Sequence, residues 1–413
     1  MFPGSTIIKK VRKMLILDHP YVSEFLKDTA AEMQIPVLKN EMAAGIDVEK
    51  RLKLLEEAEF IELIKEEGEY ALYSNSENSI GWISENLGFT ELPEKIELFK
   101  SKIKFRKLLE RIYPDFYFQG VEFEKLDEIR VEEIKKPFII KPDVGFFSLG
   151  VYKVSTDEEW EPVLWRIKAE VEEVKGRYPV QVLDTGNFII EENIKGEEFA
   201  VDAYFNRAGK PVVLDILKHI FSSENDVSDR VYFTSKAIIE NYRETVEDLL
   251  KEIGKLAGLR NFPLHMELRV GKDRRIQIIE LNPIRFAGWC TTDIAHFAYG
   301  INTYRYFFEQ LEPNWNKVLA GKEGKSFCLV ILNKPAEINS KAVQTFDYEK
   351  LLSDFEKPLE LRKTDHEKYG LFGYVFTETR DSNWVEIKRI LKSDLREYIS
   401  FKEIASDVPM LKD

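Results

Sequence analysis

The chain has 413 residues, which is more than one hydrophobic core usually serves, so we expect two or three domains. Its net charge of −13 argues against nucleic acid as the main partner, because phosphate binding requires a basic surface. With 32% charged residues, no secretory signal at its start and no apolar run near the roughly 20 residues that span a bilayer, it is expected to be cytoplasmic and to have no membrane role.

The first part of the chain has the pattern of an opening βαβ unit. Polar residues at Asp18, at His19 and in the turn 74–79 follow two of its strands, where open α/β sheets bind ligands, although a capping or turn role explains each of them better. The first strand is not followed by a Gly-rich loop, which disfavours a dinucleotide-binding domain. The predicted elements are strands at 11–17, 35–39 and 70–73 and helices at 21–34 and 48–64.

A basic helix over 94–111 is followed by a strand, 138–142, that contains Lys141 near its end. Gly145 and Gly150 bracket the loop between this strand and the next one, 151–154. Such a loop can fold over phosphates while the lysine supplies charge, or it can be an ordinary hairpin connection.

After a helix over 158–175, an apolar strand beginning at 187 runs into Glu191, a glycine and a second strand ending at Asp202. A crossing of this kind, with backbone amides and a glutamate at the join, can grip an adenine edge and a ribose diol. The following elements are a strand at 210–218, a polar aperiodic loop at 221–235 and an amphipathic helix at 240–258.

Two apolar runs, 263–270 and 276–283, flank a polar turn and predict an antiparallel hairpin. If the turn is centred between Asp273 and Arg274, the numbers of paired residues sum to 547, and Glu267 faces Glu280. Asn282 shares the face of Glu280 because side chains alternate with a period of two. Facing carboxylates repel unless a cation lies between them, and few hard oxygen ligands suit Mg²⁺. The alternative is a solvated hairpin whose carboxylates are neutralised by neighbouring basic residues.

The C-terminal part, beyond a Gly/Lys linker at 321–325, is expected to be a small α+β domain. It has strands at 326–332 and 372–377 and a helix at 384–398, and no residue in it signals chemistry. The two cysteines, Cys290 and Cys328, lack metal-ligand spacing, so we expect both to be buried apolar residues rather than a disulfide or a metal site.

The order of these pieces resembles the ATP-grasp superfamily over about residues 95–310. The basic helix, the strand-Lys-Pro with its glycine loop, Glu-Glu-x-Ile-x-Gly-x-Glu and the Glu…Glu-x-Asn hairpin occur in register. The chain is most similar to carboxylate–amine ligases of the L-amino-acid and D-alanine:D-alanine types, and more distantly to biotin carboxylase. The resemblance implies a mixed α/β and α+β fold: a pre-ATP-grasp α/β domain (1–94), an ATP-grasp core of two α+β subdomains (95–320) and a small C-terminal α+β domain (321–413).

The resemblance also implies site residues. It assigns phosphate contacts to Lys102 and Lys141, adenine binding to Glu191 and the Ile194 backbone, ribose binding to Glu198, the metal to Glu267, Glu280 and Asn282, and stabilisation of the transferred phosphate to Arg285. The chain departs from the family pattern in two places. Arg285 follows Asn282 by three positions instead of two, and Phe146 and Phe147 occupy the phosphate loop where relatives have glycine and serine.

The implied function is an ATP-dependent ligase that uses Mg²⁺ or Mn²⁺ to activate a small carboxylate as an acyl phosphate for attack by an amine. A phosphotransferase and a non-catalytic nucleotide-binding protein are the alternatives. Arg230 is a candidate for the substrate carboxylate, although a surface pair with Asp229 explains it slightly better. Lys218 is a candidate for a further phosphate contact, and an exposed lysine at a strand end explains it equally. A role for His219 or His265, the identity of the substrates and a homo-oligomeric state are left open.

Overall fold

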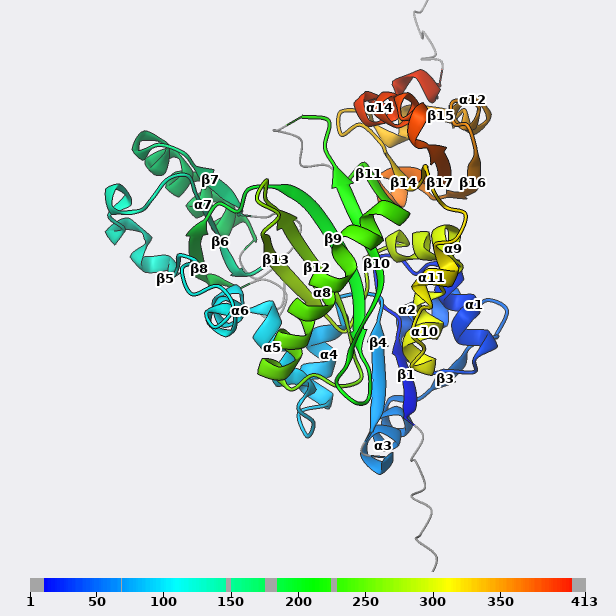
Figure 1. Cartoon of the computed structure of the whole chain (residues 1–413), viewed down its shortest axis with the longest axis horizontal. Helices are drawn as coiled ribbons and strands as arrows, with labels where there is room; N and C mark the ends of the chain where they lie inside the picture. The colour runs from blue at the N-terminus through cyan, green and yellow to red at the C-terminus, as the bar shows by residue number, and fades with distance from the viewer. Residues whose placement is uncertain (1–10, 68, 146–149, 175–183, 224–228, 403–413) are drawn as a thin grey trace, which may run out of the picture. The chain divides into compact units, whose positions relative to one another are not determined.

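The computed structural model describes residues 11–67, 69–145, 150–174, 184–223 and 229–402 (Figure 1). The chain divides into two compact units. Unit 1 comprises Met1–Ile216, Asn241–Asp293 and Ile301–Pro313, and unit 2 comprises Leu217–Glu240, Ile294–Gly300 and Asn314–Asp413. The domain boundaries expected at residues 94 and 320 stay predictions, since the two units interleave along the chain. Among the described residues, no helix has both the length and the apolarity needed to cross a bilayer.

Unit 1 begins with a parallel four-stranded sheet whose strands alternate with helices, as predicted. Its elements are β1 (Arg12–Ile16), α1 (Glu24–Glu32), β2 (Pro36–Leu38), α2 (Glu41–Ile46), β3 (Lys53–Leu55), α3 (Glu57–Glu67), β4 (Tyr70–Ser74) and α4 (Ser79–Asn86), with strand order β3-β2-β1-β4. Helix α1 begins after Ser23, whose hydroxyl accepts a hydrogen bond from the Leu26 amide. The helix predicted over 48–64 is wrong in its first half, because residues 53–55 pair with β2. Strand pairing has overridden local helix propensity there.

The basic segment forms two helices instead of the single predicted one, α5 (Leu92–Lys100) and α6 (Lys102–Leu109). The break falls at Ser101, whose hydroxyl accepts a hydrogen bond from the Lys104 amide at 3.1 Å and so caps α6. Serine competes for backbone amides at helix starts, which explains why a continuous helix does not form. As a result, Lys102 stands at the first position of α6.

The next part of unit 1 is a four-stranded antiparallel sheet with one helix packed on it. Its elements are β5 (Phe118–Glu122), η1 (Phe123–Glu128), η2 (Val131–Glu133), β6 (Phe138–Val144), β7 (Tyr152–Val154), η3 (Asp157–Glu159), α7 (Trp160–Val174) and β8 (Asp184–Glu192), with strand order β5-β8-β6-β7. Phe138, Ile140 and Phe188 from the strands pack with Trp160 and Leu164 of α7, so a single apolar core fixes β6 and β8, which carry Lys141 and Glu191.

The predicted hairpin lies in the remaining part of unit 1. Its surroundings are β9 (Glu197–Phe205), β10 (Pro211–Ile220), α8 (Lys236–Ala257), β12 (Phe262–Val270), β13 (Ile276–Pro283), η4 (Thr291–Asp293) and α10 (Thr303–Glu309), with strand order β13-β12-β9-β10. The end of β10 from residue 217 and the start of α8 up to residue 240 belong to unit 2. The predicted pairing of Glu267 with Glu280 is confirmed. Beyond it the register shifts by one, and Leu268 pairs with Ile278. The predicted register, in which paired residue numbers sum to 547, is therefore wrong between the bulge and the turn, because one extra residue, Ile279, forms a β-bulge in β13.

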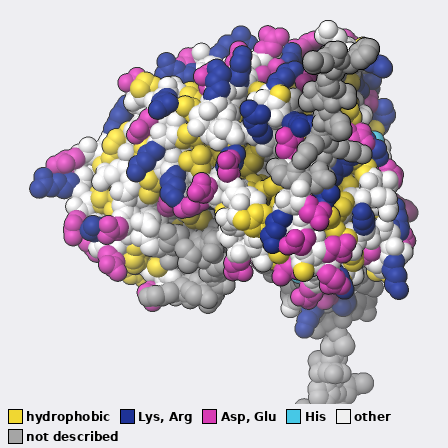
Figure 2. Space-filling model, turned by 90° about the horizontal axis from the view of Figure 1, so that it is seen from below, with side chains coloured by type: hydrophobic (Ala, Val, Ile, Leu, Met, Phe, Trp, Pro, Cys, Tyr) yellow, Lys and Arg dark blue, Asp and Glu magenta, His cyan; other side chains and the backbone are white. Residues whose placement is uncertain are grey.

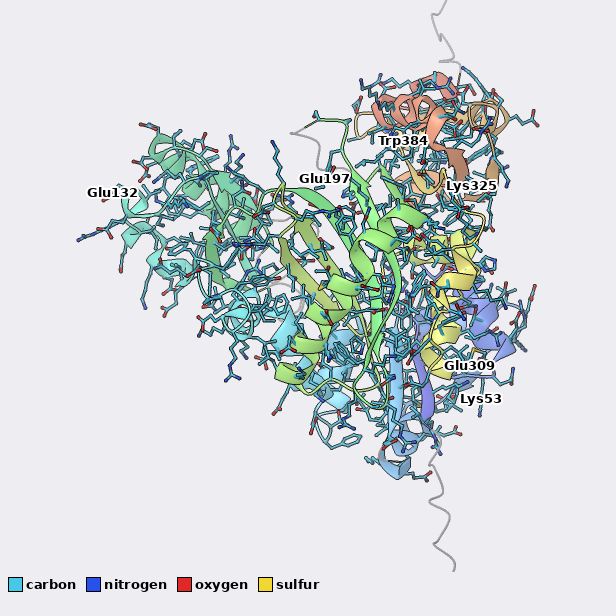
Figure 3. The ribbon with its side chains drawn as sticks, in the orientation of Figure 1. Lys53, Glu132, Glu197, Glu309, Lys325 and Trp384 are labelled. Carbon is cyan, nitrogen blue, oxygen red and sulfur yellow. The ribbon has the colours of Figure 1, made fainter. Side chains whose placement is uncertain are left out.

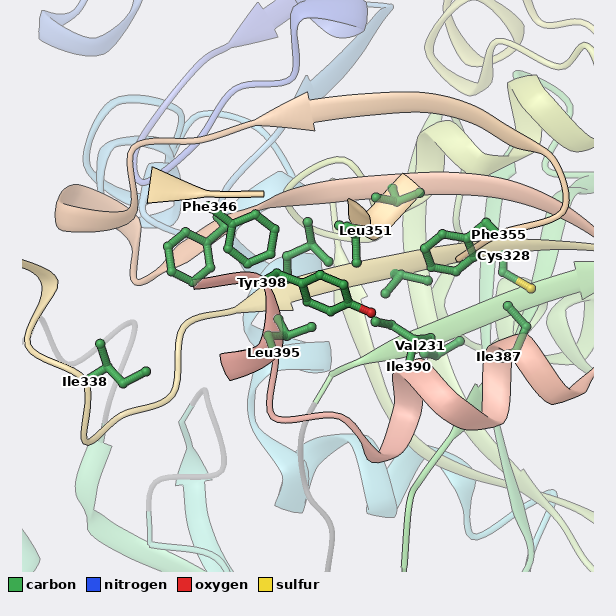
Figure 4. Close-up of a cluster of buried hydrophobic side chains, with 14 of the residues drawn as sticks. Val231, Cys328, Ile338, Phe346, Leu351, Phe355, Ile387, Ile390, Leu395 and Tyr398 are labelled. Carbon is green, nitrogen blue, oxygen red and sulfur yellow. The ribbon is translucent and has the colours of Figure 1, made fainter. Parts of the chain in front are cut away.

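Unit 2 contains antiparallel strands and short helices. Its elements are β11 (Val231–Ser235), α9 (Ile294–Tyr299), α11 (Trp315–Val318), β14 (Lys325–Asn333), η5 (Ser340–Ala342), β15 (Val343–Phe346), α12 (Tyr348–Ser353), β16 (Pro358–Lys363), α13 (His366–Tyr369), β17 (Leu371–Arg380), η6 (Asp381–Asn383), α14 (Val385–Lys392), η7 (Arg396–Tyr398) and β18 (Ile399–Phe401). Residues 231–235 pair with β14, so the predicted loop over 221–235 is wrong for this stretch. The core includes Cys328, Phe346, Leu351 and Tyr398 (Figure 4).

Both cysteines are fully buried, which confirms the prediction that each is a buried residue. Burial raises the pKa of the Cys328 thiol well above its ordinary value, so that sulfur is unreactive.

Candidate functional site

On the face shown in Figure 2, Lys and Arg side chains are interspersed with Asp and Glu. A multiply charged anion requires cations gathered at one place. Such a group exists among the buried residues of unit 1, which include Lys100, Arg106 and Lys141. These side chains come from α5, α6 and β6. Arg106 donates hydrogen bonds to backbone carbonyls of β13, and Lys100 and Lys141 interact electrostatically with Glu280 of the same strand.

The oxygen ligands predicted on the hairpin share one face of it. Glu267 and Glu280 are directly opposed, and the Asn282 Nδ2 donates a hydrogen bond to Glu280 Oε1 at 3.0 Å. Both glutamates are half-buried, whereas Asn282 is buried. The described residues include no group of three or more His, Cys, Asp or Glu side chains suited to a metal ion. Two carboxylates and an amide oxygen fit Mg²⁺, which keeps several waters and takes further ligands from phosphates.

Three lysines act on Glu280. Burial would raise the pKa of this carboxyl group, but the charges of Lys102, Lys100 and Lys141 lower it below its ordinary value. Burial in turn lowers the pKa of Lys102 to about 8, against the attraction of Glu280. The predicted phosphate lysines and the predicted metal carboxylates therefore lie in one electrostatic cluster.

Glu191 lies at the edge of this cluster, and both of its carboxylate oxygens accept from cations. Oε1 is 2.7 Å from Lys141 Nζ, and Oε2 is 2.6 Å from Arg106 Nε. Burial would raise the pKa of Glu191, but Lys141 and Arg106 lower it to about 2. The side chain thus remains ionised and fixes Lys141, so an adenine contact at this residue would have to come from its backbone. Sequence reasoning missed Arg106, although its position four residues after Lys102 places both on one face of α6.

Glu198 and Ile194, the residues assigned to the nucleoside, are linked by Arg269. The Glu198 Oε2 accepts from Arg269 Nη2 at 2.9 Å, and Arg269 Nη1 donates to the Ile194 carbonyl at 2.7 Å. Arg269 of β12 pairs with Glu198 of β9 across the sheet. This cross-strand ion pair fixes the junction at which the sequence predicts adenosine binding.

Arg285 reaches the cluster by way of an unusual backbone conformation. Ile284 has a φ of 59°, which is costly for a β-branched residue, and its carbonyl accepts from the Ser74 amide at 2.9 Å. The Arg285 guanidinium donates to Glu77 Oε1 from Nη2 at 3.0 Å, and Lys100 Nζ is 2.6 Å from Glu77 Oε2. The extra residue between Asn282 and Arg285 is thus accommodated by a left-handed turn held by the Ser74–Glu77 segment. Sequence reasoning missed Glu77 and Lys100 as members of this cluster.

His265 also lies beside the site. Its Nδ1 is 2.8 Å from Asp202 Oδ1, which also accepts from the Ala287 amide, and its Nε2 is 3.7 Å from Glu267 Oε1. The histidine ring is therefore oriented by Asp202 toward a predicted metal ligand.

Lys218, His219 and Arg230 belong to unit 2, and their roles stay predictions. The Arg230 Nη1 donates to the Ser393 carbonyl at 3.1 Å. The His219 ring stacks on Tyr232 with centroids 4.3 Å apart, and the nearby Asp229 accepts from the Tyr232 hydroxyl at 2.6 Å. Phe146 and Phe147, which depart from the family's phosphate loop, lie outside the described residues.

Residues 134–293 match the family model of the ATP-grasp domain. This segment is an ATP-grasp domain. It contains Lys141, Glu191, Glu198, the hairpin and Arg285, whereas Lys102 and Glu77 precede it. The match therefore covers most, but not all, of the cluster described above.

Proteins similar to this chain include ligases. Over 171 residues it is 26% identical to alanine–anticapsin ligase of Bacillus amyloliquefaciens; the match covers 38% of this chain, and the chain spans only 35% of that relative's length. The crystal structure of an L-amino acid ligase from Bacillus licheniformis has a TM-score of 0.67 at 16% identity, covering 96% of this chain and 100% of that one.

A third similar protein is the biotin carboxylase domain of a Hydrogenobacter thermophilus 2-oxoglutarate carboxylase, solved with MgADP, ADP and bicarbonate. It has a TM-score of 0.61 at 15% identity and covers 95% of this chain and 91% of that one. The structural matches establish the fold and confirm the predicted class of mixed α/β and α+β architecture.

Proposed function

We propose that this protein is an ATP-dependent ligase that activates a small carboxylate as an acyl phosphate, which an amine then attacks. The observation that carries the proposal is the cluster of Lys100, Lys102 and Lys141 around Glu280, with Glu267 opposite and Arg285 nearby. A cation-rich site with two carboxylates for a divalent metal matches the charge pattern of a metal-bound polyphosphate. The similarity to alanine–anticapsin ligase supports a carboxylate and an amine as substrates.

The proposal gives each of these side chains a role. Lys102 and Lys141 hold the phosphates, and Arg285 offsets negative charge that develops on the transferred phosphoryl group. Glu267, Glu280 and Asn282 would hold Mg²⁺ or Mn²⁺, and the bound ion supplies charge neutralisation between the phosphates. Catalysis by this site is therefore mainly positioning and electrostatic, without a nucleophilic side chain.

A phosphotransferase on the same fold would use the same cluster but stop at a phosphorylated product. The two are distinguished by incubating the protein with ATP, Mg²⁺ and amino acids, singly and in pairs, and analysing the products by mass spectrometry. A ligase yields ADP, phosphate and a condensed product in amounts equal to one another. A phosphorylated product without condensation would overturn the ligase proposal, and an absence of nucleotide turnover with every pair would overturn an enzymatic role.

Replacing Glu198 by Ala tests the ribose contact. We expect KM for ATP to rise about tenfold with kcat nearly unchanged, because the ribose hydroxyls are bound equally in the ground and transition states. Glu197→Ala is the matched control, since Glu197 is exposed at the first position of β9 (Figure 3). A fall in kcat with an unchanged KM, or an equal effect in both variants, would contradict the assignment.

The lowered pKa of Lys102 makes nucleotide binding dependent on pH. Since this pKa is about 8, the lysine is charged below pH 8 and increasingly neutral above it. We expect the affinity for ADP, measured by calorimetry in EDTA, to fall about tenfold between pH 7 and pH 9.5. Lys102→Arg should show little of this fall, because a guanidinium stays protonated. The same fall in both proteins would show that another group is responsible.

A further inference from the structure

The β-bulge in β13 lies directly beside a predicted metal ligand. Glu267 pairs with Glu280 and the next residue of β12, Leu268, pairs with Ile278, so Ile279 is the extra residue. A bulge changes the direction of the neighbouring side chains and is common next to active sites. The orientation of Glu280 therefore depends on whatever holds the bulge in place.

Arg106 of α6 holds it. Its Nη1 donates to the Ile278 carbonyl at 2.7 Å and its Nη2 to the Ile279 carbonyl at 3.1 Å. Its Nε donates to Glu191 Oε2 at 2.6 Å. The guanidinium lies 4.6 Å from the Phe116 ring centroid, and the residue is only 4% exposed. Each guanidinium nitrogen thus has a defined acceptor in a buried environment.

Continuous contacts therefore run from the phosphate lysine to the metal carboxylate. Lys141 contacts Glu191, Glu191 contacts Arg106, and Arg106 contacts the two carbonyls that precede Glu280. The guanidinium group of arginine is planar and rigid, and its N–H groups can donate to three acceptors that lie in different directions. A lysine at this position would offer only a compact ammonium group, which cannot reproduce both bonds to the bulge together with the bond to Glu191.

We propose that Arg106 is a positioning residue that sets Glu280 relative to Lys141, so that metal binding and phosphate binding are coupled. This inference rests on the proposed function. Arg106 acts through Glu280 and Glu191 and does not itself contact nucleotide or metal. Its loss should mainly change the Mg²⁺ dependence of nucleotide binding, because the bulge would lose the bonds that orient Glu280, whereas Lys141 would keep its own bond to Glu191.

The experiment measures ADP binding by calorimetry in EDTA and at increasing Mg²⁺ concentrations, for the wild-type chain and Arg106→Lys. We expect ADP affinity in EDTA to fall no more than about threefold, whereas the Mg²⁺ concentration that gives half of the affinity gain rises about tenfold. Arg243→Lys is the matched control, since Arg243 forms a more exposed ion pair with Glu247 on α8. Folding is checked by thermal unfolding.

If Arg106→Lys does not fold, Glu191→Gln tests the same link, because it removes the charged anchor of Arg106 and leaves both bulge carbonyls. A Mg²⁺ requirement raised at least threefold supports the proposal. A wild-type Mg²⁺ requirement in a folded variant overturns it. If the wild-type chain itself shows no Mg²⁺-dependent gain in ADP affinity, the proposed function fails, and that outcome is distinct from a failure of Arg106 alone.

Discussion

Replacing Glu280 by Gln is expected to reduce MgATP-dependent turnover by about 100-fold or more. A neutral amide is a weaker ligand for a hard divalent cation. Glu280 lies opposite Glu267, so in the variant Glu267 would be the one carboxylate of this pair left to hold the metal ion. The substitution also removes the anion that Lys100, Lys102 and Lys141 share. Turnover is measured at saturating ATP and Mg²⁺, and Mg²⁺-dependent ADP binding is measured beside it.

The same variant should be slightly less stable than the wild type. Considered alone, two facing glutamates repel each other, so removing one would be expected to stabilise the metal-free protein. In the structure, however, Lys100, Lys102 and Lys141 attract the Glu280 carboxylate. Because the pKa of Glu280 is lowered in the folded state, its charge stabilises the fold above its unfolded pKa, and the neutral amide loses that contribution. Glu312→Gln is the control, since it removes an exposed partner of Lys210. Wild-type turnover in Glu280→Gln would refute the metal assignment.

The hairpin could be predicted from the sequence because its signals are local. Alternation of apolar and polar residues fixes which face each side chain takes, and a short turn fixes the approximate register. Glu267, Glu280 and Asn282 were therefore brought together correctly. The register fails only after the bulge at Ile279, which depends on the bonds from Arg106, a residue more than 170 positions away in the chain.

Long-range partners account for most of what the sequence did not reveal. The short strand β3 forms because β2 offers an edge, and residues 231–235 form a strand because β14 pairs with them. The role of Glu77 is invisible in its own Ser-Asn-Ser-Glu turn, since Arg285 lies 208 residues away. Of the missed site residues, only Arg106 could have been predicted from the sequence, by its helical spacing from Lys102. The helix break at Ser101 could also have been predicted, because serine is favoured at helix starts.

The contact of Glu77 with Arg285 leads to the second large effect. The guanidinium is held by this carboxylate, while the Ser74 amide fixes the strained Ile284 just before it. Burial would raise the pKa of Glu77, but Lys100 and Arg285 lower it to about 2, so the carboxylate is charged throughout any practical assay range. Its function would be to fix a positive charge where the transferred phosphoryl group develops negative charge.

Glu77→Gln is therefore expected to lower kcat by about 10- to 100-fold while KM for ATP changes little. An amide keeps the size of the side chain but can accept from only one of its two cationic neighbours without turning an NH₂ group toward the other. Glu91→Gln is the control, because it removes an exposed ion pair with Lys95 in the same unit. The measurement is steady-state kinetics from pH 6 to pH 9. A flat ratio of variant to wild-type kcat across this range is expected, since Glu77 does not titrate there, and an unchanged kcat would show that Arg285 needs no such support.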